Sequence, residues 1–134
     1  MPHPLVLESL KNSKLSKYIL DDFSYDDVLA YTKVLITDYS SIAYDAFYRG
    51  SNIIFYWEEK EYCMEQYGGH LMLNDSNAFG EICYNQQELK SIIENEYKSG
   101  HKAENIAKYR KIVKFYDNRN THRLIGFLKK DKII

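Results

Sequence analysis

Residues 34–56 read VLITDYSSIAYDAFYRGSNIIFY, and this stretch decides the fold class. The runs 34–37 and 53–56 are apolar and rich in β-branched residues, and each has the length of a strand buried on both faces. A polar turn follows the first run and leads into a helix predicted over 42–49, which ends at a glycine. Strand, turn, helix and strand in this order form a βαβ unit, which implies a parallel sheet with a right-handed crossover. The sequence therefore predicts an α/β domain.

The flanking segments add mainly helices. Ser24, followed three residues later by Asp27, is a capping-box pattern and predicts a short helix through Tyr31. Residues 18–20 fit a short strand, whereas 57–84 are expected to be irregular because they contain glycine and asparagine turn signals. Helices are then predicted over 86–97, 103–116 and 121–130. Their apolar residues recur at helical spacing and should face inward: Leu89, Ile92, Ile93, Ile106, Tyr109, Val113, Tyr116, Leu124, Ile125 and Leu128.

Length and composition indicate one globular domain over residues 1–134, with 45% apolar and 28% charged residues. No apolar run approaches the ~20 residues of a membrane span, and the first ten residues lack the features of a signal peptide. A soluble, cytoplasmic protein is expected. The two cysteines, Cys63 and Cys83, exclude a disulfide framework or a four-cysteine zinc site and are expected to be lone buried thiols. No metal-ligand spacing links the four histidines, so neither a metal nor a cofactor is predicted.

The net charge of −1 hides an asymmetry between the two ends of the chain. Residues 1–100 carry 8 basic and 16 acidic side chains, a net −8, whereas residues 101–134 carry 10 basic and 3 acidic ones, a net +7. Such a split is typical of a basic tail that meets an anionic surface, and equally of a solvated basic helical face. No nucleic-acid-binding motif accompanies the basic segment, so no nucleic-acid partner is expected.

The turn at residues 37–41 is the clearest candidate for chemistry. In open α/β sheets, ligands bind beyond the carboxyl ends of the strands, where this turn must lie. The first N–H groups of the following helix lack partners and carry partial positive charge, and Ser40 and Ser41 add two hydroxyl donors. Together they could cradle a phosphate; the alternative is that one serine serves only as the helix cap. Asp38 is expected to be a turn residue, and Glu58-Glu59 a solvated turn.

Residues 34–62, VLITDYSSIAYDAFYRGSNIIFYWEEKEY, resemble the signature of the CDP-glycerol glycerophosphotransferase family, bacterial enzymes of wall teichoic acid and capsule synthesis. The likeness extends to His3-Pro4 and to segments 24–37, 87–89 and 117–123. The sequence departs from the family pattern at Asn118, where glycine is usual, and in 74–84, which lack the usual Pro-Gly.

The resemblance implies a GT-B fold, which has two Rossmann-like halves with the active site between them. The chain would be the C-terminal, donor-nucleotide-binding half, with a Rossmann-like parallel sheet and flanking helices. The N-terminal acceptor half would be absent, because the chain is either a piece of a longer protein or a truncated gene product.

The resemblance also assigns roles to individual residues. His3 matches the family's active-site histidine, whose expected role is to stabilise charge on the donor phosphate as the nucleotide leaves. Ser40 and Ser41 should contact the donor diphosphate together with the backbone after Thr37. Asp45 lies one helical turn after Ser41 and would accept hydrogen bonds from ribose hydroxyls or from a neighbouring backbone. The predicted donor-binding set is Thr37, Tyr39, Ser40, Ser41, Ile42 and Asp45.

The reaction implied by the resemblance transfers glycerol phosphate from CDP-glycerol to a hydroxyl of a polyol-phosphate or polysaccharide acceptor and releases CMP. The chain alone should bind the nucleotide weakly and catalyse nothing. Two alternatives stay open: a non-catalytic nucleotide-binding or interaction domain, and a transferase for another activated donor such as CDP-ribitol or a nucleotide sugar. Two hypotheses stay open for the last helices: their basic residues could contact the inner face of the cell membrane, or the last helix could pack over the missing half. The basic residues concerned are Lys108, Lys111, Lys114, Lys129 and Lys130.

Overall fold

The computed structural model describes residues 4–20, 23–66, 68–69 and 71–133. The chain divides into two compact units, Met1–Thr32 and Lys33–Ile134, which are described separately. The prediction of one domain over 1–134 is not tested by this division and stays a prediction.

The first unit is helical where it is described. It contains α1 (Pro4–Lys11), the 3-10 helix η1 (Ser16–Tyr18) and α2 (Tyr25–Tyr31). The predicted capping box is confirmed, because the Ser24 hydroxyl accepts from the Asp27 N–H at 3.1 Å and the Asp27 carboxylate accepts from the Ser24 N–H at 3.3 Å. The predicted strand over 18–20 is wrong. Its backbone is used locally, since the N–H groups of Tyr18 and Ile19 donate to carbonyls three residues earlier.

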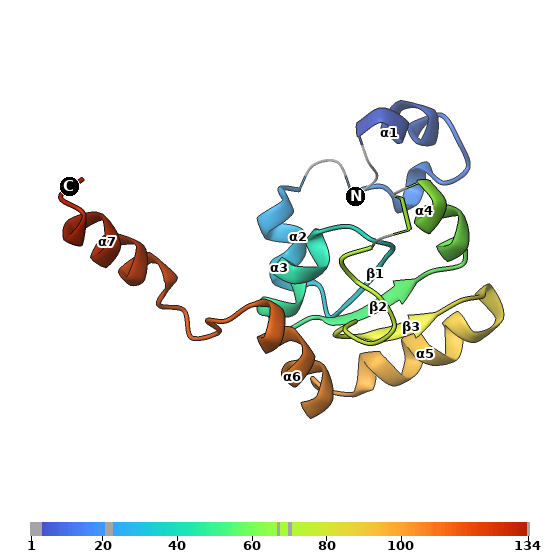
Figure 1. Cartoon of the computed structure of the whole chain (residues 1–134). Coiled ribbons are helices and arrows are strands. Elements are labelled where there is room, and N and C mark those ends of the chain that lie inside the picture. The colour runs from blue at the N-terminus through green and yellow to red at the C-terminus, as the bar shows by residue number, and fades with distance from the viewer. Residues whose placement is uncertain (1–3, 21–22, 67, 70, 134) are drawn as a thin grey trace. The chain divides into compact units, whose positions relative to one another are not determined.

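The second unit is built on a parallel sheet, as the sequence predicted. Its strands β1 (Val34–Thr37), β2 (Asn52–Tyr56) and β3 (Glu81–Cys83) lie side by side in the order β1-β2-β3 (Figure 1). Helix α3 (Ile42–Tyr48) packs against β1 and β2, and α5 (Gln86–Lys98) packs against all three strands. The sheet flanked by helices is the expected Rossmann-like α/β arrangement.

The segment between β2 and α5 is more regular than predicted. It contains α4 (Lys60–Gln66) as well as β3, so the expectation of an irregular segment over 57–84 is wrong. Only three residues make up β3, which is too short for a periodic pattern to reveal it. Its strand conformation comes from pairing with β2, where Ile54 lies opposite Glu81 and Tyr56 opposite Cys83.

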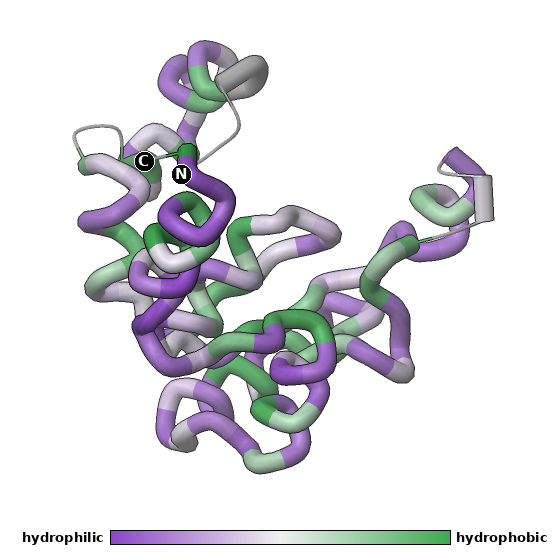
Figure 2. Tube along the Cα trace, turned by 60° about the vertical axis from the view of Figure 1, so that its left-hand side comes forward, coloured by the Kyte–Doolittle hydropathy of each residue, from purple (hydrophilic) through white to green (hydrophobic). Residues whose placement is uncertain are grey.

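An aromatic cluster forms the core of this unit. Phe79, fully buried in the segment before β3, lies about 5 Å from the rings of Phe47 (5.3 Å), Phe55 (5.4 Å) and Tyr109 (5.0 Å). Tyr109 belongs to α6 (Ala103–Ile112), and its hydroxyl donates to the carbonyl of Tyr44 on α3 at 2.9 Å. The cluster therefore joins β2, α3 and α6. Figure 2 shows how such hydrophobic stretches, in green, alternate with hydrophilic ones along the chain.

The last two helices differ in how far they contribute to this core. Helix α6 ends at Ile112 rather than at residue 116, because Val113 is extended. Tyr109 is buried, and Ile106, Val113 and Tyr116 are partly buried, as predicted. Helix α7 (Asn120–Lys130) has no buried residue: Leu124 and Ile125 are exposed, and Leu128 is only partly buried. The prediction that α7 faces inward is therefore wrong for Leu124 and Ile125.

Candidate functional site

The turn after β1 is held by its own backbone and by Asp38. The Asp38 carboxylate accepts from the Ser40 N–H at 3.1 Å, which confirms its predicted role as a turn residue. The carbonyls of Ser40 and Ser41 accept from Ala43 and Tyr44 at 3.3 and 3.0 Å and so begin α3. Ser41 occupies the N-cap position in a helical conformation, and its side chain makes no capping bond. Neither serine hydroxyl has a hydrogen-bond partner within the described residues, so the capping alternative is wrong.

An aromatic stack joins the carboxyl ends of β1 and β2. The ring of Tyr39 lies on that of Trp57 with centroids 5.1 Å apart and an interplanar angle of 11°. The Trp57 indole N–H donates to the carbonyl of Asp38 at 3.3 Å. Burial, with a smaller effect from Cys63, raises the pKa of Tyr39 to about 12. The stack fixes the position of the turn relative to the end of β2.

Two adjoining cavities open at this edge of the sheet, and we call them together the carboxyl-edge cavity. Their volumes are about 230 and 460 Å³, and Trp57, Glu58 and Glu59 line both. The smaller one is completed by Asp38, Tyr39, Tyr56 and Cys63, and the larger one by Lys60, Glu61, Tyr62 and Tyr84. This is the place at which open α/β sheets bind their ligands.

Carboxylates dominate the charge of the carboxyl-edge cavity. Glu58 is held by Tyr56, whose hydroxyl donates to its Oε2 at 2.6 Å, and this bond raises the pKa of Tyr56 to about 12. The ammonium of Lys60 pairs with the carboxylate of Asp75, which also accepts from the Tyr84 hydroxyl. These two bonds lower the pKa of Asp75 to about 2. The cavity therefore offers carboxylate acceptors, while the Lys60 ammonium on its wall is already paired.

The predicted donor-binding residues lie along the turn and the start of α3. Thr37 ends β1, Ser40, Ser41 and Ile42 follow at the beginning of α3, and the exposed Asp45 lies one turn later. Of the predicted residues that the structure describes, only Tyr39 lines the carboxyl-edge cavity. His3 lies outside the described residues. The binding and catalytic roles of this set remain predictions.

Sequence reasoning missed the opposite wall of the cavity. Glu58 and Glu59 form the exposed turn that was predicted, separated from the end of β2 by Trp57, and in addition they line both cavities. The signal was present, because the rule that places ligands after parallel strands applies to the second strand as much as to the first. Of the two thiols predicted to be buried, Cys83 is buried but Cys63 is only partly so and lines the smaller cavity.

The segment before α7 explains one departure from the family pattern. Asn118, where glycine is usual, has a φ of 57°, in the left-handed region that asparagine tolerates better than most residues. Its side-chain oxygen accepts from the Tyr48 hydroxyl at 2.6 Å. Asp117 precedes Asn118 in the chain, and the guanidinium of Arg123 donates to both of its carboxylate oxygens, at 2.7 and 2.6 Å. Asparagine therefore preserves the backbone conformation for which glycine is suited.

The sheet and its flanking helices define a Rossmann-like α/β fold with two cavities at its carboxyl edge. The model of the protein family described as CDP-glycerol:poly(glycerophosphate) glycerophosphotransferase matches residues 1–130. The chain belongs to this family, and its membership supports a transferase function of the glycerophosphotransferase type. No curated protein and no solved structure matched the chain. Among the described residues, no helix is long and apolar enough to cross a membrane.

Proposed function

We propose that the chain is the donor-binding half of a GT-B transferase that moves glycerol phosphate from CDP-glycerol to a hydroxyl of a polyol-phosphate or polysaccharide chain. Family membership supports the donor and the polymeric acceptor. The observation that carries the binding part is the turn after β1, where two serine hydroxyls have no partner within the described residues. Hydroxyls in this position can donate to an anion, which the partial positive charge of a helix start also favours.

The proposed donor lies across the start of α3. Its diphosphate contacts Ser40, Ser41 and the backbone from Thr37 to Ile42, and Tyr39 supports the turn through its stack on Trp57. Asp45 is one helical turn further along and is exposed, so its carboxylate is free to accept from ribose hydroxyls. A carboxylate beside the phosphates would repel them, which is why we assign Asp45 to the ribose.

In the proposed reaction, an acceptor hydroxyl attacks the β-phosphate of CDP-glycerol. The new bond joins the acceptor oxygen to phosphorus, the bond between the two phosphates breaks, and CMP leaves with the electron pair while the hydroxyl proton is lost to a base. Positioning and charge stabilisation are the protein's main contributions to such a transfer. His3 is the proposed group that stabilises the leaving phosphate. In a GT-B enzyme the acceptor belongs to the other half, so we expect this chain alone to bind nucleotide without turnover.

The same proposal places the protein at the inner face of the cell membrane, in wall or capsule polymer synthesis. Helix α7 supports this, since it exposes Leu124, Ile125 and Phe127 and carries Lys129 and Lys130 in its last turn. An amphipathic basic helix of this kind suits an anionic lipid surface.

Calorimetric titration of the chain with CDP, UDP and inorganic phosphate tests the donor site. We expect CDP to bind most tightly, and the double variant Ser40→Ala/Ser41→Ala to weaken it by about 10- to 100-fold, because each lost bond goes to a charged group. Ser91→Ala, on the exposed side of α5, is the matched control and should change nothing. CDP binding that survives the double variant would contradict the proposed site. Tighter binding of another nucleotide would favour a relative with a different donor.

A further inference from the structure

The charge of the carboxyl-edge cavity decides which part of a substrate it can hold. Asp38, Glu58 and Glu59 line its smaller part, and none of the described residues that line this part is basic. In the larger part, the Lys60 ammonium is paired with Asp75. Carboxylates repel a diphosphate at this range, so the phosphates belong at the serines and not in the cavity. An uncharged group that donates hydrogen bonds fits better.

The geometry of Glu58 favours a hydroxyl ligand. The Tyr56 hydroxyl donates a hydrogen bond to Oε2 of Glu58 at 2.6 Å. This bond orients the carboxylate and leaves its Oε1 as an acceptor for a ligand. The Glu59 carboxylate makes no hydrogen bond within the described part of the chain. Two neighbouring carboxylates beside the rings of Tyr39 and Tyr56 offer acceptors for O–H groups and apolar faces for C–H groups. A short polyol presents both.

A bound cation is the competing occupant of an acidic cavity. Among the described residues, no three carboxylate, thiol or imidazole groups come close enough together to hold a metal ion. The described carboxylates of the cavity therefore do not form a coordination shell of three or more protein ligands. This favours the polyol.

We infer that the carboxyl-edge cavity binds the glycerol group of the donor, with Glu58 as its main hydroxyl acceptor and Tyr56 as the residue that positions Glu58. This inference rests on the proposed donor site, because the cavity adjoins the turn through Asp38 and Tyr39. It divides the donor between two surfaces: phosphates on the serines, polyol on the carboxylates. Glu58 then contributes to the choice between donors that differ in their polyol.

Trp57 reports directly on this cavity, because it is the single tryptophan of the chain and lines both parts. Its indole N–H gives one distinct signal in a proton–nitrogen NMR spectrum. We expect CDP-glycerol to shift this signal further than CDP does, since the Trp57 N–H also bonds to the turn that CDP contacts. The affinity for CDP-glycerol should exceed that for CDP by about tenfold. Glu58→Gln should remove most of that difference while CDP binds as before.

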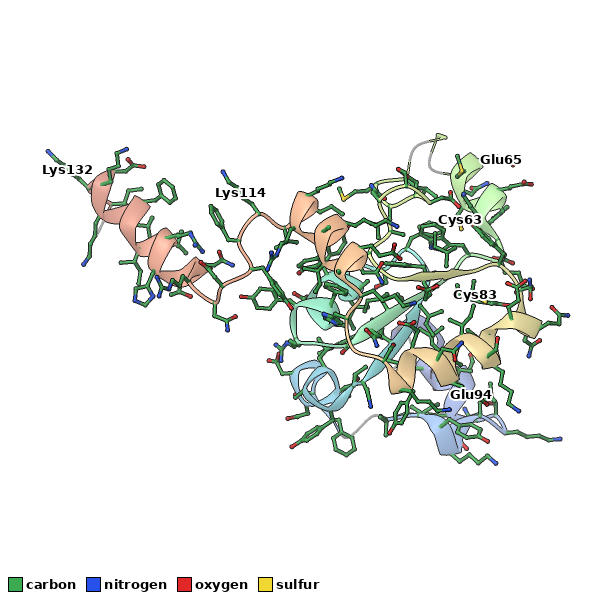
Figure 3. All side chains as sticks on the ribbon, turned by 90° about the horizontal axis from the view of Figure 1, so that it is seen from below. Cys63, Glu65, Cys83, Glu94, Lys114 and Lys132 are labelled. Carbon is green, nitrogen blue, oxygen red and sulfur yellow. The ribbon has the colours of Figure 1, made fainter. Side chains whose placement is uncertain are left out.

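The control is Glu65→Gln, a change of the same kind on the exposed surface of α4, where Figure 3 labels both Glu65 and Cys63. It should leave both affinities unchanged. Equal affinity for CDP and CDP-glycerol in the wild-type chain would overturn the inference, as would an equal loss of both in Glu58→Gln. A Trp57 shift caused by Mg²⁺ that blocks the response to the polyol would also overturn it.

A second titration distinguishes failure of the proposed donor site from failure of the polyol site. If CDP leaves the amides of residues 37–45 unchanged, the proposed function fails, and free glycerol then tests the cavity alone. A Trp57 shift with glycerol that Glu58→Gln abolishes would support the polyol site independently. No shift would overturn it together with the donor site.

Discussion

Phe79 is the residue on which the core of the second unit depends most. It is fully buried between rings from β2, α3 and α6. Phe79→Ala removes these contacts and leaves a cavity, so we expect the free energy of unfolding to fall by about 3–5 kcal/mol. Urea denaturation measures the loss. Phe127→Ala on α7, where the ring is 63% exposed, is the matched control and should stay within about 0.5 kcal/mol of the wild type.

Asp75 gives a second prediction at the residue scale. Hydrogen bonds from Lys60 and Tyr84 lower its pKa from 3.8 to about 2. Because the folded pKa lies below the unfolded one, the stabilisation by Asp75 is fully present above the unfolded value and is lost as the pH falls through about 2. Carbon-13 NMR of the carboxyl groups should show this low midpoint, and Lys60→Met should raise it. A wild-type midpoint near 3.8 would contradict the Lys60–Asp75–Tyr84 arrangement.

Among the elements, the contact between β2 and the residue before β3 is the tightest. A Cβ atom added at Gly80 would overlap the carbonyl oxygen of Ile53. We expect Gly80→Ala to force the strands apart and to lower the free energy of unfolding by about 1–3 kcal/mol. Gly126→Ala in α7 meets nothing within 4 Å and should instead favour the helix, because alanine has the higher helix propensity. If Gly80→Ala were as stable as the wild type, the contact between residue 80 and the Ile53 carbonyl would have to be less close than in the structure.

Helix α7 carries the prediction about the membrane. The wild-type chain should co-sediment with vesicles that contain anionic lipid, and added salt should weaken this binding. Lys129→Glu/Lys130→Glu reverses two charges in the last turn of α7 and should reduce the binding strongly. Lys90→Glu on the exposed surface of α5 is the control for a general charge effect. Absence of salt-sensitive vesicle binding in the wild type would contradict the membrane proposal.

Two further lysines, Lys114 and Lys132, lie before and after α7 in the chain and are labelled in Figure 3.

The elements that the sequence predicted correctly are those whose local pattern and tertiary environment agree. The predicted runs 34–37 and 53–56 lie in the sheet, where the second strand begins one residue earlier, at Asn52. Ser24 with Asp27 forms the expected cap. Strand β3 was missed because its conformation depends on pairing with β2, which no local pattern contains. The apolar stripe of α7 correctly indicated a helix, but a stripe does not tell what covers it.

The candidate site was predicted on one side only. The turn at Asp38–Ser41 was recognisable because it joins a buried strand to a helix start. The residues opposite the turn, Trp57, Glu58 and Glu59, follow the next strand, and the two glutamates indicated only the exposed turn that they form. The unengaged hydroxyls of Ser40 and Ser41 depend on the helix being started by backbone bonds, and sequence alone does not distinguish this from side-chain capping.

For the whole molecule, the central claim is that this family member binds a cytidine nucleotide at the turn after β1. An amide-resolved NMR titration of the full chain with CDP, with UDP and inorganic phosphate as controls, tests it most directly. We predict chemical-shift changes centred on residues 37–45, with CDP effective at the lowest concentration. An equal response to all three ligands would reduce the site to a general anion site at a helix start. No response at millimolar CDP would contradict the claim.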